Sequence, residues 1–209
     1  MTGRAEAKLL NSARTNPILA RHLTRRLEKE SKFVEALRTS AEALLVEAMN
    51  DTEWAPGLLR KLATLPDVPD SSRAMMLSAW IRWGDSWRNN VNNDVLLIDT
   101  LRNLLPPYRG GEVRLFRGDS AFNRRRRTYG MSWTVDRIVA ESFAEGNASM
   151  YDGGTVVLET LAPSTAIICV PHDHIEHAYA GEVEYLVDRR RLGDVNLVKR
   201  YGAPAALAQ

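Results

Sequence analysis

Apolar residues in the first part of the chain recur mostly at steps of three and four, the spacing of a helix with one buried face. This pattern predicts helix over residues 17–48, either as one long helix or as two helices with a break near Ser31. Asn16 followed by Pro17 is typical of a helix N-cap and first turn.

Three shorter helices are predicted after this segment. Residues 54–69 contain three prolines and favour a short helix between turns. A helix over 70–88 would carry Trp80, Trp83 and Trp87 on one side, a stripe that is usually a packing surface and less often a partner surface. An asparagine-rich turn precedes the last predicted helix of this half, residues 94–105.

Beyond the double proline that follows, segments become short, β-branched and separated by glycine, which is typical of strands. The predicted strands are residues 113–116, 130–134, 155–161, 166–170, 182–187 and 195–201. One helix is predicted among them, beginning near Asp136. Helices first and strands later indicate an α+β chain with a helical region over 1–107 and a second domain over 108–209.

Composition and charge exclude few classes of function. The net charge of +2 is too small to demand a polyanionic partner. No apolar run approaches the ~20 residues of a membrane span, and no apolar segment follows the polar N-terminus, so we expect no membrane partner and no secretory signal. A cytoplasmic location fits, as does delivery into a host cell as an effector or phage protein. Cys169, among β-branched residues, is expected to be a buried thiol rather than a reactive one.

Three short strings carry the candidate chemistry. The first places Arg117 and Gly118 at the end of an apolar strand. The second alternates Ser132 and Thr134 with a tryptophan on a strand, so the two hydroxyls share a face. The third is Tyr-Ala-Gly-Glu-Val-Glu over residues 179–184, with two glutamates on one face of a strand.

Taken together and in this order, these strings resemble the arginine–serine–glutamate class of mono-ADP-ribosyltransferases. The family pattern is an aromatic-Arg, then Ser-x-Ser or Ser-x-Thr, then Glu-x-Glu preceded by an aromatic, the place of Tyr179 here. The resemblance covers residues 108–201, about half of the chain. It implies a fold of two packed, mainly antiparallel sheets, NAD as co-substrate and a protein acceptor, with no metal.

The resemblance also implies roles for the glutamates and the arginine. Glu184 would stabilise the ribosyl cation that forms as nicotinamide leaves and hold the ribose, as carboxylates do in glycoside hydrolysis. Glu182 would meet the acceptor, and a glutamate there goes with an arginine side chain as the acceptor in this family. Arg117 would contact the NAD phosphates, which suit a guanidinium.

The remaining residues would surround the nicotinamide and the acceptor. Gly118 would let its backbone approach the nicotinamide amide, Ser132 would orient Glu184, and Thr134 and Phe143 would shape the nicotinamide pocket. Tyr179 would belong to a substrate-recognition loop over residues 174–181. Residues 145–154, polar and containing glycine, are the expected flexible loop over NAD.

Each assignment has a plainer alternative. Arg117 would then be a strand-end arginine paired with Asp119. Ser132 and Thr134 would be solvent-facing hydroxyls, and the two glutamates would lie on the solvent-exposed face of an edge strand. The short central motif also departs from the family, because Trp133 is bulkier than the usual threonine; its ring facing the core would make this harmless.

Two further features are less specific. His172, His174 and His177 have a spacing similar to zinc ligands, but no cysteine or second cluster completes a site, and a polar loop is favoured. Arginines 124–127 indicate a solvated basic loop, or a surface for an acidic protein, nucleic acid or the adenosine phosphates.

The sequence therefore predicts an NAD-dependent transferase that modifies a protein arginine, with NAD hydrolysis as a side activity. The alternative is an inactive relative that binds an acidic protein or nucleic acid through residues 124–127 and the Trp80 face. Both glutamates being present favours the enzyme, and nucleic acid is not the favoured partner.

Overall fold

The computed structural model describes residues 11–41, 56–173 and 183–202. The chain divides into two compact units, Met1–Leu105 and Pro106–Gln209. In the part described, no helix combines the length and the apolar character that crossing a membrane requires.

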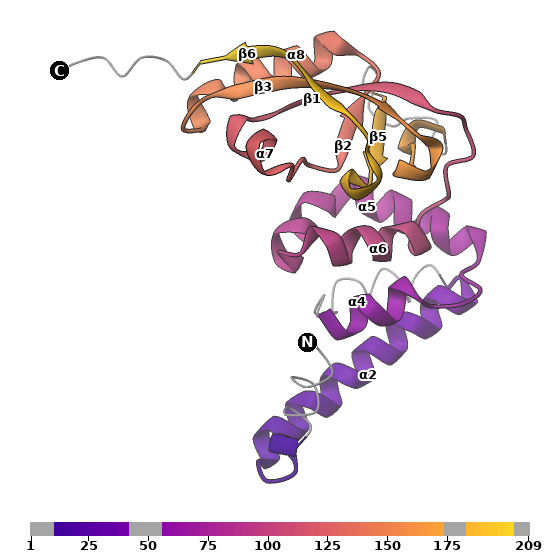
Figure 1. Ribbon diagram of the computed structural model, residues 1–209. Coiled ribbons are helices and arrows are strands. Elements are labelled where there is room, and N and C mark those ends of the chain that lie inside the picture. Colours follow the sequence, from indigo (N-terminus) through magenta and orange to yellow (C-terminus); the bar gives the residue numbers. More distant parts are fainter. Residues whose placement is uncertain (1–10, 42–55, 174–182, 203–209) are drawn as a thin grey trace, which may run out of the picture. The chain divides into compact units, whose positions relative to one another are not determined.

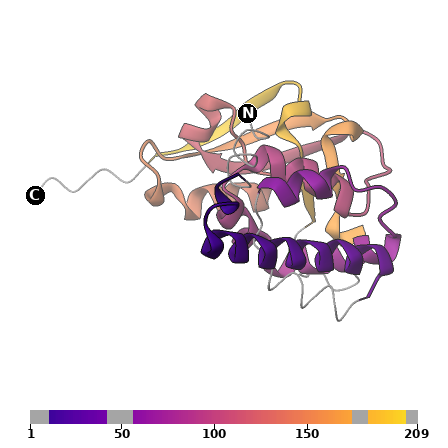
Figure 2. The ribbon, with the colours of Figure 1, turned by 90° about the horizontal axis from the view of Figure 1, so that it is seen from below.

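The first unit is helical and its helices run from indigo to magenta in Figures 1 and 2. They are α2 (Pro17–Thr39), α4 (Pro56–Ala63), α5 (Asp70–Val91) and α6 (Asp94–Leu104). The predicted cap is confirmed, because the Asn16 side chain accepts hydrogen bonds from the backbone N–H groups of the first turn. Helix α2 passes through Ser31 without a break and ends at Thr39, before residues 42–48, which lie outside the described residues.

The tryptophan stripe of α5 lies mostly in the core. Trp80 and Trp87 are buried and their rings meet edge-on, with centroids 6.0 Å apart, while Trp83 is half-buried. Helix α5 also extends to Val91, so the turn predicted from residue 89 begins later. It ends at Asn92, whose φ of 44° is a left-handed conformation that asparagine tolerates.

The second unit contains the strands, so the predicted α+β class is confirmed (Figure 1). The strands are β1 (Val113–Ser120), β2 (Ser132–Thr134), β3 (Thr155–Ala162), β4 (Ile167–Cys169), β5 (Glu184–Val187) and β6 (Val195–Tyr201). The described residues form a single six-stranded sheet in the order β4-β5-β2-β1-β3-β6, with every pair antiparallel. The expectation of two packed sheets is corrected, because β2 pairs with both β1 and β5 and so links all strands.

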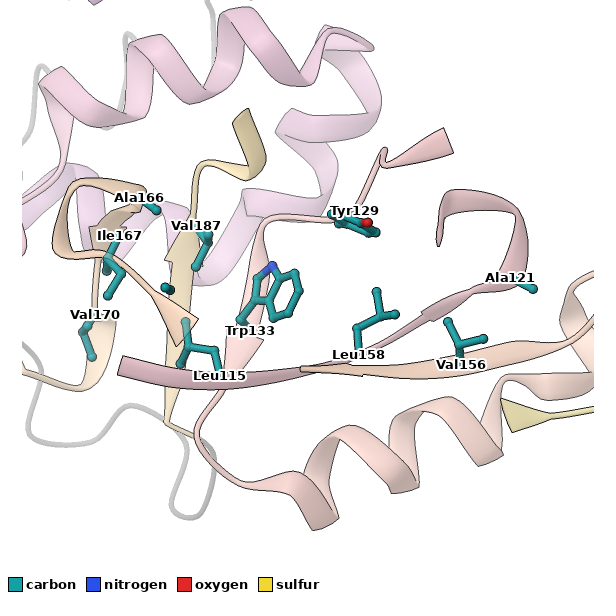
Figure 3. Packing of buried hydrophobic residues seen from close by; sticks show 11 residues of the cluster. Leu115, Ala121, Tyr129, Trp133, Val156, Leu158, Ala166, Ile167, Val170 and Val187 are labelled. Atoms are coloured by element: carbon teal, nitrogen blue, oxygen red, sulfur yellow. The ribbon is translucent and has the colours of Figure 1, made fainter. Parts of the chain in front are cut away.

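The two faces of this sheet are covered differently. One face carries the larger core, in which the Trp133 ring packs with strand residues such as Leu115 and Leu158 (Figure 3). The other face is covered by α8 (Arg137–Gly146), whose Ala140 and Ala144 pack on Val157. Trp133 therefore faces the core, so its bulk does not alter the face that carries Ser132 and Thr134.

Two segments predicted as loops contain helix. Arginines 124–126 belong to α7 (Ala121–Arg126), whose first turn is capped by the Ser120 side chain. Residues 145–154 contain the end of α8 and a 3-10 turn, η1 (Ala148–Met150), before a tight turn at Gly153 and Gly154, both with positive φ. Shorter 3-10 turns occur at η2 (Ser164–Ala166), η3 (Pro171–Asp173) and η4 (Arg189–Arg191).

Candidate functional site

The three sequence motifs lie on adjacent strands of the sheet. Thr134 of β2 is directly opposite Phe116 of β1 on one side and Glu184 of β5 on the other. Because residues directly opposite each other in an antiparallel sheet share a face, these three side chains form a row across one face. Segments far apart in the sequence are thereby brought to the same level of the sheet.

Ser132 lies diagonally from Glu184 on this face. It is opposite Leu186, two residues beyond Glu184, and its side chain is exposed. Diagonal neighbours on a sheet are ~7–8 Å apart, within reach of a long side chain. The register therefore puts the Ser132 hydroxyl and the Glu184 carboxylate on the same face, near each other.

Thr134 has a local structural task. Its hydroxyl accepts a hydrogen bond from the Asp136 N–H at 3.0 Å, and the Asp136 side chain caps the start of α8. The side chain is buried rather than solvent-facing. Thr134 thus joins the strand that carries the serine motif to the helix that covers the sheet.

Arg117 forms the ion pair with Asp119 that the plainer alternative predicts. Its Nε donates to Asp119 Oδ2 at 2.7 Å, and its Nη1 donates to the Ser132 carbonyl at 2.5 Å. Gly130 leaves room for the guanidinium, since a Cβ there would come within 2.1 Å of Arg117 Nη2. The side chain of Arg117 therefore bridges β1 and β2 where the two strands separate.

Asp119 is the centre of this arrangement. Its carboxylate is buried and also accepts hydrogen bonds from the N–H groups of Ser120 and Gly130 and from the Asn123 amide. Burial opposes ionisation, but the Arg117 charge and these hydrogen bonds outweigh it and hold the pKa of Asp119 below its ordinary value. Asp119 is consequently ionised at neutral pH and fixes Arg117.

The end of β1 borders a small hollow. Strand β1 pairs with β3 along its whole length, but among the described residues it pairs with β2 only at Phe116. The β2 side of residues 117–120 is therefore not paired with β2. The hollow at this edge has a volume of about 30 Å³, room for one water molecule. Its lining consists of Arg117, Gly118, Asp119, Ser120, Phe143, Ala144, Asn147, Tyr151 and Thr155.

Gly118 has a packing reason of its own. A Cβ at this position would come within 2.6 Å of the Ala140 carbonyl oxygen and 2.8 Å of the Ala144 nitrogen. Glycine is therefore required for α8 to pack on β1. This packing brings Phe143, which is on α8, to the rim of the hollow.

The rim carries two exposed aromatic side chains. Phe143 is 60% and Tyr151 is 44% exposed. Tyr151 and Asn147 were not singled out from the sequence, where their only signal was a place in the polar segment 145–154. The sequence indicates Asp119 only as a partner for Arg117.

Glu184 is half-buried, and its charge acts on the thiol of Cys169. Burial, Asp173 and Glu184 raise the pKa of Cys169 to about 12, so this buried thiol is protonated at neutral pH. Cys169 is therefore a structural residue, as predicted, and not a thiolate nucleophile.

Part of the predicted site lies outside the described residues. This applies to Glu182, to Tyr179 with the recognition loop 174–181, and to two of the three histidines, while His172 lies in η3. Within the described ranges no group of His, Cys, Asp and Glu side chains is arranged to hold a metal ion.

No family model, no curated protein and no solved structure matches this chain. The functional argument therefore depends on the site itself.

Proposed function

We propose that the chain transfers ADP-ribose from NAD to a protein arginine and releases nicotinamide. The observation that carries this proposal is the row Phe116, Thr134 and Glu184 across β1, β2 and β5. It places the three motifs of the resemblance on neighbouring strands. Arg117 follows Phe116 and therefore starts from the opposite face of β1, and its guanidinium reaches β2 at the Ser132 carbonyl.

The central role belongs to Glu184. NAD supplies a pyridinium leaving group, which takes the electron pair of the glycosidic bond without needing a proton. A carboxylate beside the ribose then stabilises the positive charge that develops on the sugar. We assign this task to Glu184 because it is only half-buried, lies opposite Thr134 and is a diagonal neighbour of the exposed Ser132.

The hollow beside β1 would hold only part of the dinucleotide, because it has room for one water molecule. The rest of NAD would lie over the open edge of β1, with the rings of Phe143 and Tyr151 at the rim available for stacking. Arg117 would face the phosphates as part of its pair with Asp119, so its contribution is a directed hydrogen bond more than a net charge.

Glu182 would orient the acceptor guanidinium, which is fully protonated at neutral pH. The new bond forms between the ribose carbon and an acceptor nitrogen, which then loses its proton to the Glu182 carboxylate and from there to solvent. Where no acceptor is present, water takes its place and NAD is hydrolysed.

The test is incubation of the protein with labelled NAD and a cell lysate. The wild type is expected to label a protein band, and Glu184→Gln is expected to abolish the label. Glu112→Gln is the matched control, since Glu112 is exposed and precedes β1. Absence of both label and nicotinamide release would refute the enzyme and leave a binding protein.

A further inference from the structure

Two arginine runs that are distant in the sequence meet on the surface of the second unit. The first is Arg124–Arg127 at the end of α7, and the second is Arg189–Arg191, which forms η4. Arg127 Nη2 donates to the Gly193 carbonyl at 3.4 Å, and Arg189 Nη1 donates to the Tyr129 carbonyl at 2.8 Å. We refer to these seven arginines as the arginine surface.

A hollow lies between the two runs. It is lined by Arg127, Tyr129, Arg189, Arg190, Leu192 and Val195. Its volume is about 330 Å³, within the range of small-molecule sites and far above that of the hollow beside β1. Three guanidinium groups thus line a space large enough for a nucleotide unit.

The arginines of this hollow are held in place. The fully buried Asp188 carboxylate accepts from Arg190 Nε at 2.8 Å and Nη2 at 2.9 Å, and Arg191 lies 3.6 Å from it. Fixing a long side chain before binding removes part of the entropy loss on binding. The two runs place seven guanidinium charges on the arginine surface, although the net charge of the whole chain is only +2.

An aromatic side chain accompanies the charges. Phe122 of α7 is 48% exposed, and the Arg126 guanidinium lies over its ring, 4.6 Å from the centroid. Exposed aromatic rings and arginines beside a positive groove are the features with which proteins bind single-stranded nucleic acid, by base stacking and phosphate contacts. An acidic peptide offers no bases for such stacking.

We propose that the arginine surface binds single-stranded nucleic acid, with backbone phosphates on the guanidinium groups and one nucleotide in the 330 Å³ hollow. All seven residues of the two runs are arginine and none is lysine, which suits phosphate, because the guanidinium fork binds it through two parallel hydrogen bonds. This binding is independent of the proposed transfer of ADP-ribose.

The test measures the binding of a labelled single strand of about 20 nucleotides by fluorescence anisotropy, at salt concentrations between about 50 and 200 mM. The triple variant Arg125→Gln, Arg126→Gln, Arg127→Asn removes three exposed charges. Asparagine is used at Arg127 because φ there is 55°. Binding at the lowest salt should weaken at least about tenfold, and the slope of log K against log salt should fall by about 2.

The control removes the same charge from the first unit through Lys32→Gln, Arg38→Gln and Arg82→Gln, which are exposed. It should bind as the wild type does. Phe122→Leu keeps every charge and should weaken binding about fivefold or more by removing a stacking surface. Thermal melting identifies a variant that fails to fold. If the triple variant does not fold, the single variant Arg125→Gln replaces it and should show a smaller loss of binding.

Three results would overturn the proposal. One is no binding by the wild type at the lowest salt. Another is equal binding by the two triple variants. The third is displacement of the strand by polyglutamate as readily as by unlabelled strand, which would make the ligand an acidic protein segment.

Discussion

Two hollows lined by arginine lie in the described part of the second unit, and they differ in how the arginine charge is used. Beside β1, Arg117 is mostly buried and paired with Asp119, and the hollow has room for one water molecule. Beside η4, three arginines line a hollow of about 330 Å³, and the Asp188 carboxylate accepts hydrogen bonds from Arg190. The same residue type therefore serves local architecture in one place and presents positive charge in the other.

The difference shows that an arginine motif is not by itself an anion site. At β1 the charge of Arg117 is neutralised by Asp119, and the proposed chemistry depends instead on a carboxylate, Glu184 of β5. At η4 three guanidinium groups line one larger hollow, and the ligand that we propose there is a polyanion. The roles of the two hollows can be tested separately by substitutions that affect one hollow and leave the other unchanged.

The largest expected effect comes from removing the carboxylate that neutralises Arg117. Asp119→Ala should lower the free energy of unfolding by about 3–5 kcal/mol, because it leaves a mostly buried guanidinium without its counter-charge. Urea denaturation measures this free energy of unfolding. The control is Asp152→Ala, at an exposed position, whose free energy of unfolding should lie within about 0.5 kcal/mol of the wild-type value. A loss below about 1 kcal/mol for Asp119→Ala would mean that the pair does not organise the hollow.

The next effect concerns the acceptor of the proposed reaction. Glu182→Ala should reduce protein labelling at least about 100-fold while NAD hydrolysis persists, because orienting the acceptor and stabilising the ribosyl charge are separate tasks. Labelling and nicotinamide release are measured on the same sample. An equal loss of both would contradict the role given to Glu182.

A smaller effect is expected at the contact between β1 and α8. Gly118→Ala should destabilise the fold by about 1–3 kcal/mol and slow nicotinamide release, because its methyl group would push against backbone atoms of α8 and displace Phe143. Gly111→Ala is the control, since a Cβ there meets nothing within 4 Å. Equal melting temperatures for the two variants would show that α8 yields without strain.

The smallest effect is a pH dependence that belongs to the β1 hollow. The folded-state pKa of Asp119 lies below its ordinary 3.8, so its ionisation adds stability above that pH. This contribution is lost as pH falls through the lowered pKa. Wild type should therefore lose more stability than Asp119→Asn between about pH 5 and pH 2. Other groups that titrate in acid, such as Glu141, are present in both proteins and cancel in the difference between their stabilities. Parallel curves of stability against pH for the two proteins would contradict the lowered pKa of Asp119.

Much of the fold was predictable because the pattern is local. Strand β6 has the bounds that its alternating residues predicted, and the cap at Asn16 begins α2 as expected. The single sheet was not predictable, since it depends on the short strand β2 pairing on both sides. Helix α7 was missed because four consecutive arginines hide any periodicity in a helix of six residues.

The candidate site was predictable in its motifs but not in its contacts. The order of Arg117, Ser132 and Glu184 along the chain says nothing of register, yet the row across β1, β2 and β5 depends on it. The meeting of Arg127 with the segment after η4 is a contact between distant segments, for which no spacing in the sequence gives a signal.

The most direct measurement of the central claim is nicotinamide release from NAD by the purified protein. The wild type should release nicotinamide, Glu184→Gln should be slower by about 100- to 1,000-fold, and Glu112→Gln should match the wild type. Release by Glu184→Gln at the wild-type rate, or no release by the wild type even with lysate as acceptor, would contradict the account.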